Sequence, residues 1–125
     1  MFERLSEHFT AAEFTCRCQN PKCPAQKRPH PALVERLEEL RTLWGRPIWI
    51  ISGIRCVDYN KTVGGAPASQ HLLGKAADIK TENENEVRAL AALAERVGFK
   101  GIGTGKRKLH VDVRAGRRAR WTYEE

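Results

Sequence analysis

The sequence predicts an α+β fold: one domain with a small, mainly antiparallel sheet and helices on one side of it. Three observations support this prediction. The chain has 125 residues, a length that suits a single hydrophobic core. Apolar residues recur at helical spacing in two segments, and short runs of strand-forming residues lie between and after them. We therefore treat residues 1–125 as one domain.

The first half of the chain predicts a turn, a loop, a helix and a strand. Residues 10–13 have capping-box spacing, which predicts a short helical turn. Residues 15–31 are rich in proline and cysteine and lack periodicity, which predicts a loop. Residues 31–44 begin with proline, repeat apolar residues at helical spacing and end before glycine, which predicts a helix. Residues 47–52 are rich in strand formers, and the polar residues 55–70 predict a long irregular connection.

The second half predicts three strands, a helix and a tail. Residues 76–80 are a second strand candidate. Residues 84–97 place valine, leucine and alanine on one face and end before a glycine, which predicts a helix. Residues 101–103 and 109–113 predict strands on either side of a glycine- and lysine-rich turn, and residues 114–125 a basic tail.

The chain is basic, with 22 Lys and Arg against 15 Asp and Glu and a net charge of +7. This balance favours an anionic partner such as nucleic acid, anionic lipid or cell-wall polymer. A nucleic-acid role calls for exposed aromatic residues among the basic ones, and only Trp121 lies near them. Nucleic acid is therefore the least favoured of these partners.

Two further classes are disfavoured by the sequence. No apolar run approaches the roughly 20 residues that cross a bilayer, so we expect no membrane span. The first residues alternate charged with apolar side chains and lack the apolar core of a secretory signal. We therefore expect synthesis in the cytoplasm without a signal peptide.

Histidine and aspartate concentrate in two short segments, 69–78 and 109–113. His110 and Asp112 share one face of the predicted strand, because side chains alternate along a strand. Two imidazoles and a carboxylate, from His71, Asp78 and His110, form the ligand set of a catalytic zinc site. The spacing alone is equally compatible with turn and strand caps beside an exposed polar face.

The segment Ser69-Gln-His-Leu-Leu-Gly-Lys-Ala-Ala-Asp78 matches the signature SxHxxGxAxD. In this it resembles the zinc D-Ala-D-Ala carboxypeptidase family, especially small phage and prophage members with an N-terminal cysteine cluster. The later His-Val-Asp resembles the closing zinc-ligand segment of that family, and Ser52-Gly-Ile-Arg55 the segment before the signature. The resemblance implies the fold of these DD-peptidases, which lysostaphin-type endopeptidases and the hedgehog signalling domain share.

The resemblance also implies roles for individual residues. His71, Asp78 and His110 would ligate a catalytic Zn²⁺, which activates water and polarises the scissile carbonyl. Arg55 would pair with a substrate carboxylate or stabilise the developing oxyanion. Ser69 would hydrogen-bond the substrate or the loop backbone.

The general base is where this sequence departs from its relatives. Many of them have His-x-His at the closing segment, whereas here Asp112 follows His110. We predict that Asp112 is the catalytic base and proton shuttle, since a carboxylate beside the activated water can move its proton. The alternative is that Asp112 orients His110.

The four cysteines have two alternative explanations. Cys16 and Cys18 stand about 7 Å apart along an extended chain, beyond disulfide reach, so each needs another partner. Cys16, Cys18, Cys23 and Cys56 therefore either gather around a second, structural zinc or form two disulfides. Thiols in a protein without a secretory signal favour the metal.

The sequence as a whole predicts a zinc metallopeptidase that hydrolyses peptidoglycan stem peptides, as a D-Ala-D-Ala carboxypeptidase or an endopeptidase. We expect a monomer of the phage or prophage lysis type, released to the cell wall by another protein, with its basic residues attracting anionic cell-wall polymer. Two alternatives are an inactive zinc-stabilised domain and a basic Cys₄ zinc module that binds nucleic acid.

Overall fold

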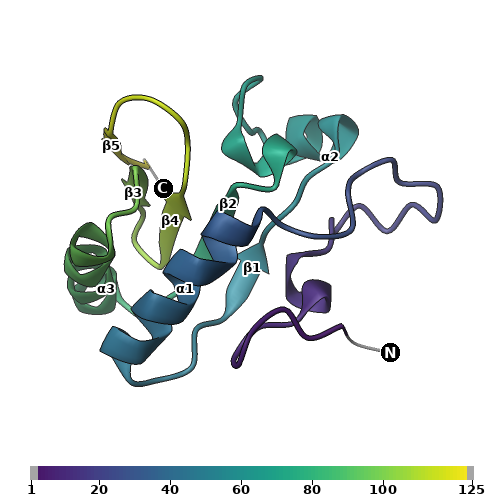
Figure 1. Ribbon diagram of the computed structural model, residues 1–125. Helices are drawn as coiled ribbons and strands as arrows, with labels where there is room; N and C mark the ends of the chain where they lie inside the picture. The colour runs from purple at the N-terminus through teal and green to yellow at the C-terminus, as the bar shows by residue number, and fades with distance from the viewer. Residues whose placement is uncertain (1–2, 124–125) are drawn as a thin grey trace.

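The computed structural model describes residues 3–123. In chain order its elements are the 3₁₀ turn η1 (Ala11–Phe14), α1 (Pro31–Trp44), β1 (Ile50–Ser52), α2 (Val57–Thr62), the 3₁₀ turn η2 (Gln70–Leu73), β2 (Ala76–Lys80), α3 (Glu84–Val97), β3 (Gly101–Thr104), β4 (Lys108–Asp112) and β5 (Ala119–Thr122). Figure 1 shows α1 and α3 beside the sheet and the N-terminal loop extending away from it.

The strands form one five-stranded sheet in the order β1-β2-β4-β3-β5. The three pairings among β1, β2, β4 and β3 are antiparallel, and β5 adds to β3 in parallel. The structure thus confirms the predicted α+β class with a mainly antiparallel sheet. Its central strand, β4, carries the closing His-Val-Asp segment.

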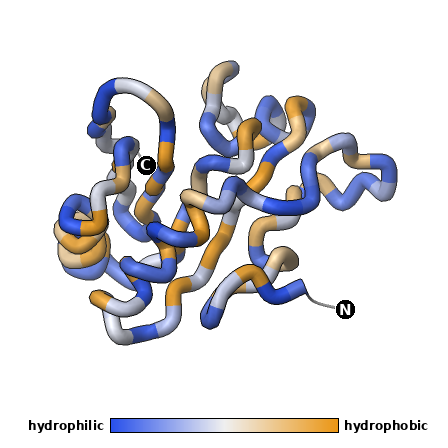
Figure 2. The backbone as a smooth tube through the Cα atoms, viewed as in Figure 1, coloured by the Kyte–Doolittle hydropathy of each residue, from blue (hydrophilic) through white to orange (hydrophobic). Residues whose placement is uncertain are grey.

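The core lies between one face of the sheet and the helices α1 and α3. Leu109 and Val111 on β4 are fully buried there. Leucines of α1, and Val87, Leu90 and Ala94 of α3, belong to the same core cluster. No residue of the 15–30 loop belongs to this core cluster, although Ala25 packs against it, and Figure 2 shows the loop largely in the colours of polar residues. Because the odd-numbered residues of β4 face the helices, His110 and Asp112 face the opposite side.

The two long helices have the predicted bounds and end as predicted. Gly45 follows α1 with φ 71° and Gly98 follows α3 with φ 98°, both in the left-handed region that glycine adopts without strain. At the start of α3, the Asn83 side chain accepts a hydrogen bond from the Glu86 N–H, a cap that contributes about 1 kcal/mol. No helix within residues 3–123 is long and apolar enough to span a bilayer.

Local structure in the 55–70 connection differs from the prediction. It contains α2, and η2 begins at its end, where an irregular segment was expected. The Cys56 sulfur accepts the Tyr59 N–H and so caps α2. Thiols are uncommon helix caps, which is why the sequence pattern gave no sign of this helix.

The predicted basic tail also contains structure. Residues 119–122 form β5, and two interactions hold this strand in place. The Arg120 guanidinium donates to both carboxylate oxygens of Glu95 on α3, each at 2.6 Å. The Trp121 indole lies where a side chain on Gly103 would otherwise be. Each contact joins residues more than 15 positions apart in the sequence. The local charge pattern of the tail therefore could not predict the strand.

Candidate metal centre

Three buried side chains converge on the polar face of the sheet. Asp78 on β2 and His110 on β4 are register partners, and His71 reaches them from η2. All three residues are at most 4% exposed, and one ligand atom from each lies within 4.8 Å of the others. The structure therefore brings together the three residues expected to bind zinc.

His71 is held so that one ring nitrogen is free to bind a metal. Its N–H donates to the Ser69 hydroxyl oxygen at 3.2 Å, which fixes the start of η2. Its Nδ1 lies 2.6 Å from the carbonyl oxygen of Gly53, so Nδ1 carries the proton that this bond requires. Nε2 is buried, has no hydrogen-bond partner and lies 3.3 Å from Asp78 Oδ2. A buried lone pair without a partner is costly, and a metal ion at this position removes that cost.

Asp78 lies at the centre of the three residues. Its Oδ1 is 3.1 Å from His110 Nδ1, and its Oδ2 accepts a hydrogen bond from the Arg55 guanidinium at 3.0 Å. Burial alone would raise the pKa of Asp78, but its contacts with His110 and His71 outweigh burial and hold the pKa well below its usual range. Asp78 is therefore an ionised carboxylate, the form that ligates a metal.

The His110 ring lies between two carboxylates. Nε2 donates to Asp112 Oδ2 at 2.7 Å, so Nδ1 is the atom that faces Asp78. Burial by itself lowers the pKa of His110, but hydrogen bonds to Asp112 and Asp78 outweigh it and raise the pKa. A metal cation between Asp78 and the two imidazole rings would balance the negative charge that a proton on His110 otherwise balances. Two imidazole nitrogens and one carboxylate oxygen are a zinc donor set, so these residues fit the metal.

Asp112 is fully buried, and both of its oxygens are engaged. Besides His110, it accepts the Arg114 backbone N–H at 3.1 Å and two guanidinium bonds from Arg114 at 2.9 and 2.7 Å. Burial would raise the pKa of Asp112, but the bonds from His110 and Arg114 hold it well below its usual range. This geometry favours the orienting role over the base role, because no oxygen of Asp112 is left for another proton.

Arg55 is likewise committed to protein partners. Its guanidinium donates to Ser52 Oγ at 3.1 Å, to Asn60 Oδ1 at 3.1 Å and to Asp78 Oδ2 at 3.0 Å. Only 11% of the side chain is exposed. Arg55 thus lies at the candidate centre and lines the cleft beside it, and its guanidinium holds Asp78 in place.

Comparison with known proteins agrees with this geometry. The family profile of peptidase M15 matches residues 7–114. The chain belongs to the peptidase M15 family. This membership confirms the resemblance carried by the SxHxxGxAxD segment.

One curated relative in this comparison is a zinc D-Ala-D-Ala carboxypeptidase from Streptomyces albus G. It is 36% identical over 102 residues, which cover 76% of this chain and 39% of the relative. The M15 chain therefore spans about two fifths of the length of that relative.

A cleft opens beside the candidate ligands of the M15 chain. Its volume is about 370 Å³, within the range of small-ligand sites. It is lined by residues 63–66 and 68–70, by both histidines of the centre and by Arg55, Lys108, Arg114, Trp121 and Tyr123. A larger hollow of about 490 Å³ beside β1 is lined by no histidine or cysteine. The smaller cleft is therefore the candidate substrate site of the M15 chain.

Several cleft residues were absent from the predicted site. The centres of the Trp121 and His110 rings lie 4.8 Å apart, and the Lys108 ammonium lies 4.2 Å from the Tyr123 ring centre. The only available signal was the pair of aromatic residues two positions apart near the C-terminus. It became meaningful once the structure showed that β5, paired with β3, places their rings against His110 and Lys108 of β4.

The positions flanking Asp112 are small. Its register partners on β2 and β3 are Ala76 and Gly101, and a Cβ on Gly101 would overlap the Asp112 carboxylate. A glycine at this position therefore leaves room for a buried carboxylate beside His110.

Gly101→Ala is expected to destabilise the fold by about 1–3 kcal/mol, the usual cost of overpacking, and to weaken metal binding by displacing Asp112. Urea unfolding and zinc titration measure the two effects. Gly116→Ala is the matched control: its Cβ meets open space and its φ of 85° carries a backbone cost only. Equal metal affinity in the two variants would contradict the prediction.

The four cysteines also come together in the M15 chain. All are free, and their sulfurs lie within 4.8 Å of one another. They form a second group of metal-ligand type among residues 3–123, built from residues other than the histidine centre.

Proposed function

We propose that this chain is a zinc-dependent peptidase that hydrolyses a bond in peptidoglycan stem peptides, either as a D-Ala-D-Ala carboxypeptidase or as an endopeptidase. One observation carries the proposal: the partnerless Nε2 of His71 is aimed at the same point as Asp78 and His110, beside an open cleft. Family membership and the similarity to a zinc D-Ala-D-Ala carboxypeptidase support it.

His71, Asp78 and His110 would hold the metal. Zinc bound there supplies Lewis-acid polarisation of the scissile carbonyl and activation of a water molecule. The protein fixes each ligand with a further partner: the Gly53 carbonyl holds His71, and Arg55 holds Asp78. Such partners set the ring tautomer and ligand orientation before substrate arrives.

We assign Asp112 the role of orienting His110. Its hydrogen bond to Nε2 leaves Nδ1 free for the metal, and its bonds to Arg114 hold the carboxylate still. The base role remains the competing assignment, and the two make different predictions for metal affinity, argued in the Discussion.

Substrate recognition in this proposal uses the cleft wall. Lys108 offers an ammonium at the cleft, suited to a peptide carboxylate. The Ser69 oxygen accepts the His71 N–H, and its own hydroxyl hydrogen remains available to a substrate carbonyl. Arg55 supports the reaction through Asp78.

The basic charge of the chain bears on how it would meet the cell wall. The net charge of +7 favours attraction of anionic cell-wall polymer by the monomer we expect. In this proposal the chain reaches the cell wall during phage- or prophage-type lysis.

Digestion of purified peptidoglycan tests the proposed function. The zinc-loaded protein is expected to release either free D-alanine, which indicates a carboxypeptidase, or stem peptides freed from their cross-links, which indicate an endopeptidase. Mass spectrometry of the products separates the two. Protein stripped with a chelator is the control, and added zinc should restore its activity. Zinc-loaded, folded protein that releases neither product would instead favour the inactive zinc-stabilised domain.

A further inference from the structure

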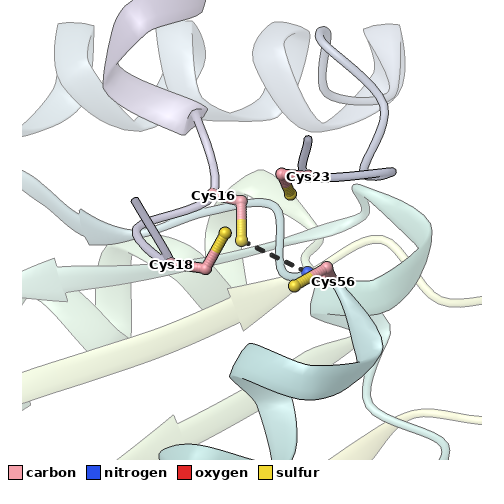
Figure 3. A group of neighbouring side chains, drawn as sticks. All are labelled: Cys16, Cys18, Cys23 and Cys56. Atoms are coloured by element: carbon pink, nitrogen blue, oxygen red, sulfur yellow. Dashed lines mark hydrogen bonds between the residues drawn. The ribbon is translucent and has the colours of Figure 1, made fainter. Parts of the chain in front are cut away.

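Four cysteines from two distant parts of the chain point toward one another (Figure 3). Cys16, Cys18 and Cys23 follow η1, and Cys56 precedes α2. A tetrahedral zinc with Zn–S bonds of about 2.3 Å separates its sulfurs by about 3.8 Å, whereas a disulfide joins sulfurs in pairs at about 2.05 Å. Four sulfurs that all lie within 4.8 Å of one another suit one tetrahedral centre.

Backbone N–H groups point at three of the four sulfurs. Cys16 Sγ accepts from the Cys56 N–H at 3.3 Å, Cys18 Sγ from the Asn20 N–H at 3.4 Å, and Cys56 Sγ from the Tyr59 N–H at 3.4 Å. An N–H donor stabilises the negative thiolate, which is the form that binds a metal. The main chain is thus arranged for charged sulfur ligands.

The loop that carries three of these cysteines has no helix or strand to hold its shape. Residues 15–30 contain no regular element. Gln19 has a φ of 62°, in the left-handed region that side chains rarely adopt, and the turn is closed by the Cys23 N–H donating to the Asn20 carbonyl at 3.0 Å. Such a conformation persists only where its surroundings enforce it. This turn brings Cys23 back toward Cys18.

We propose that Cys16, Cys18, Cys23 and Cys56 bind a structural Zn²⁺, separate from the histidine centre, that fastens the 15–30 loop to the segment before α2. The proposal does not rest on the proposed peptidase activity, since none of its ligands belongs to the candidate active site.

The cysteine site and His71 are joined by one short segment, residues 53–56. The Gly53 carbonyl accepts from His71 Nδ1, and the Arg55 N–H donates to the His71 carbonyl at 3.0 Å. The Ile54 N–H donates to the Phe14 carbonyl at 2.8 Å, and the Cys56 N–H reaches Cys16. A metal at the cysteines therefore also steadies the backbone that positions His71 and Arg55.

Metal counting on protein purified under reducing conditions tests the proposal. The wild type is expected to hold two zinc ions per chain. Cys18→Ser and His71→Ala should each lose one. In cobalt-substituted protein, the near-ultraviolet thiolate charge-transfer band should persist in His71→Ala and vanish in Cys18→Ser. Equal zinc content in wild type and Cys18→Ser would overturn the proposal, whatever the peptidase assay shows.

A second measurement needs only the wild type, in case a cysteine variant does not fold. Titration of the thiols with an organomercurial should release one zinc ion per chain, detected with a chromophoric chelator, as the fourth thiol is consumed. If no zinc is released and the intact mass is four hydrogens below that of the reduced chain, the cysteines form two disulfides and the zinc proposal is wrong.

Discussion

His71→Ala is expected to lower peptidase activity by about 10⁴-fold or more and to remove one zinc ion, because His71 supplies one of only three protein ligands in the candidate centre. The side chain is 3% exposed and Nε2 has no other partner, so nothing nearby replaces it. Rates of product release from peptidoglycan and elemental analysis of the purified variant measure the two effects.

His8→Ala is the matched control for this variant. His8 pairs with Glu38 and does not line the cleft, so the same substitution should leave activity and zinc content unchanged. Circular dichroism should show that His71→Ala keeps its fold. A folded His71→Ala that retains zinc and activity would remove the proposed centre from the mechanism.

Much of the fold could be predicted because its signals are local. α1 and α3 show a 3.6-residue periodicity with a glycine after each helix, and β2 matches residues 76–80 as predicted. In contrast, β5 depends on Arg120 meeting Glu95 and on Trp121 filling the space beside Gly103. Such contacts join residues far apart in sequence, and a local pattern does not contain them.

In the candidate site, too, some features could be predicted from the sequence and others depend on contacts that only the structure shows. Residue type and spacing left His71, Asp78 and His110 as one of two equal interpretations, and the resemblance to the zinc carboxypeptidase family then favoured them as ligands. The role of Asp112 depends on which ring nitrogen it contacts and on whether Arg114 occupies its other oxygen. Those are facts of side-chain geometry, and they favour the alternative that sequence reasoning had ranked second.

Asp112→Asn is expected to weaken zinc binding by about 10- to 100-fold, the usual effect of losing the partner of a metal-binding histidine. Without the carboxylate charge, His110 Nε2 loses its strongest acceptor and Arg114 loses its counter-ion. Removing one member of a buried pair costs about 3–5 kcal/mol, and because Arg114 is 26% exposed we expect about 2–3 kcal/mol of lost stability. Competition with a chromophoric chelator and urea unfolding measure the two quantities.

The same variant separates the two roles of Asp112. A general base acts on the reaction and not on the ligand, so loss of a base lowers kcat while zinc affinity stays at its wild-type value. Loss of an orienting residue lowers both, and the stability lost with the Arg114 pair is expected in either case. Asp58→Asn, an exposed aspartate at the start of α2, makes the same chemical change away from the centre and should alter none of them. Wild-type zinc affinity in Asp112→Asn, together with a large fall in kcat, would return the base role to Asp112.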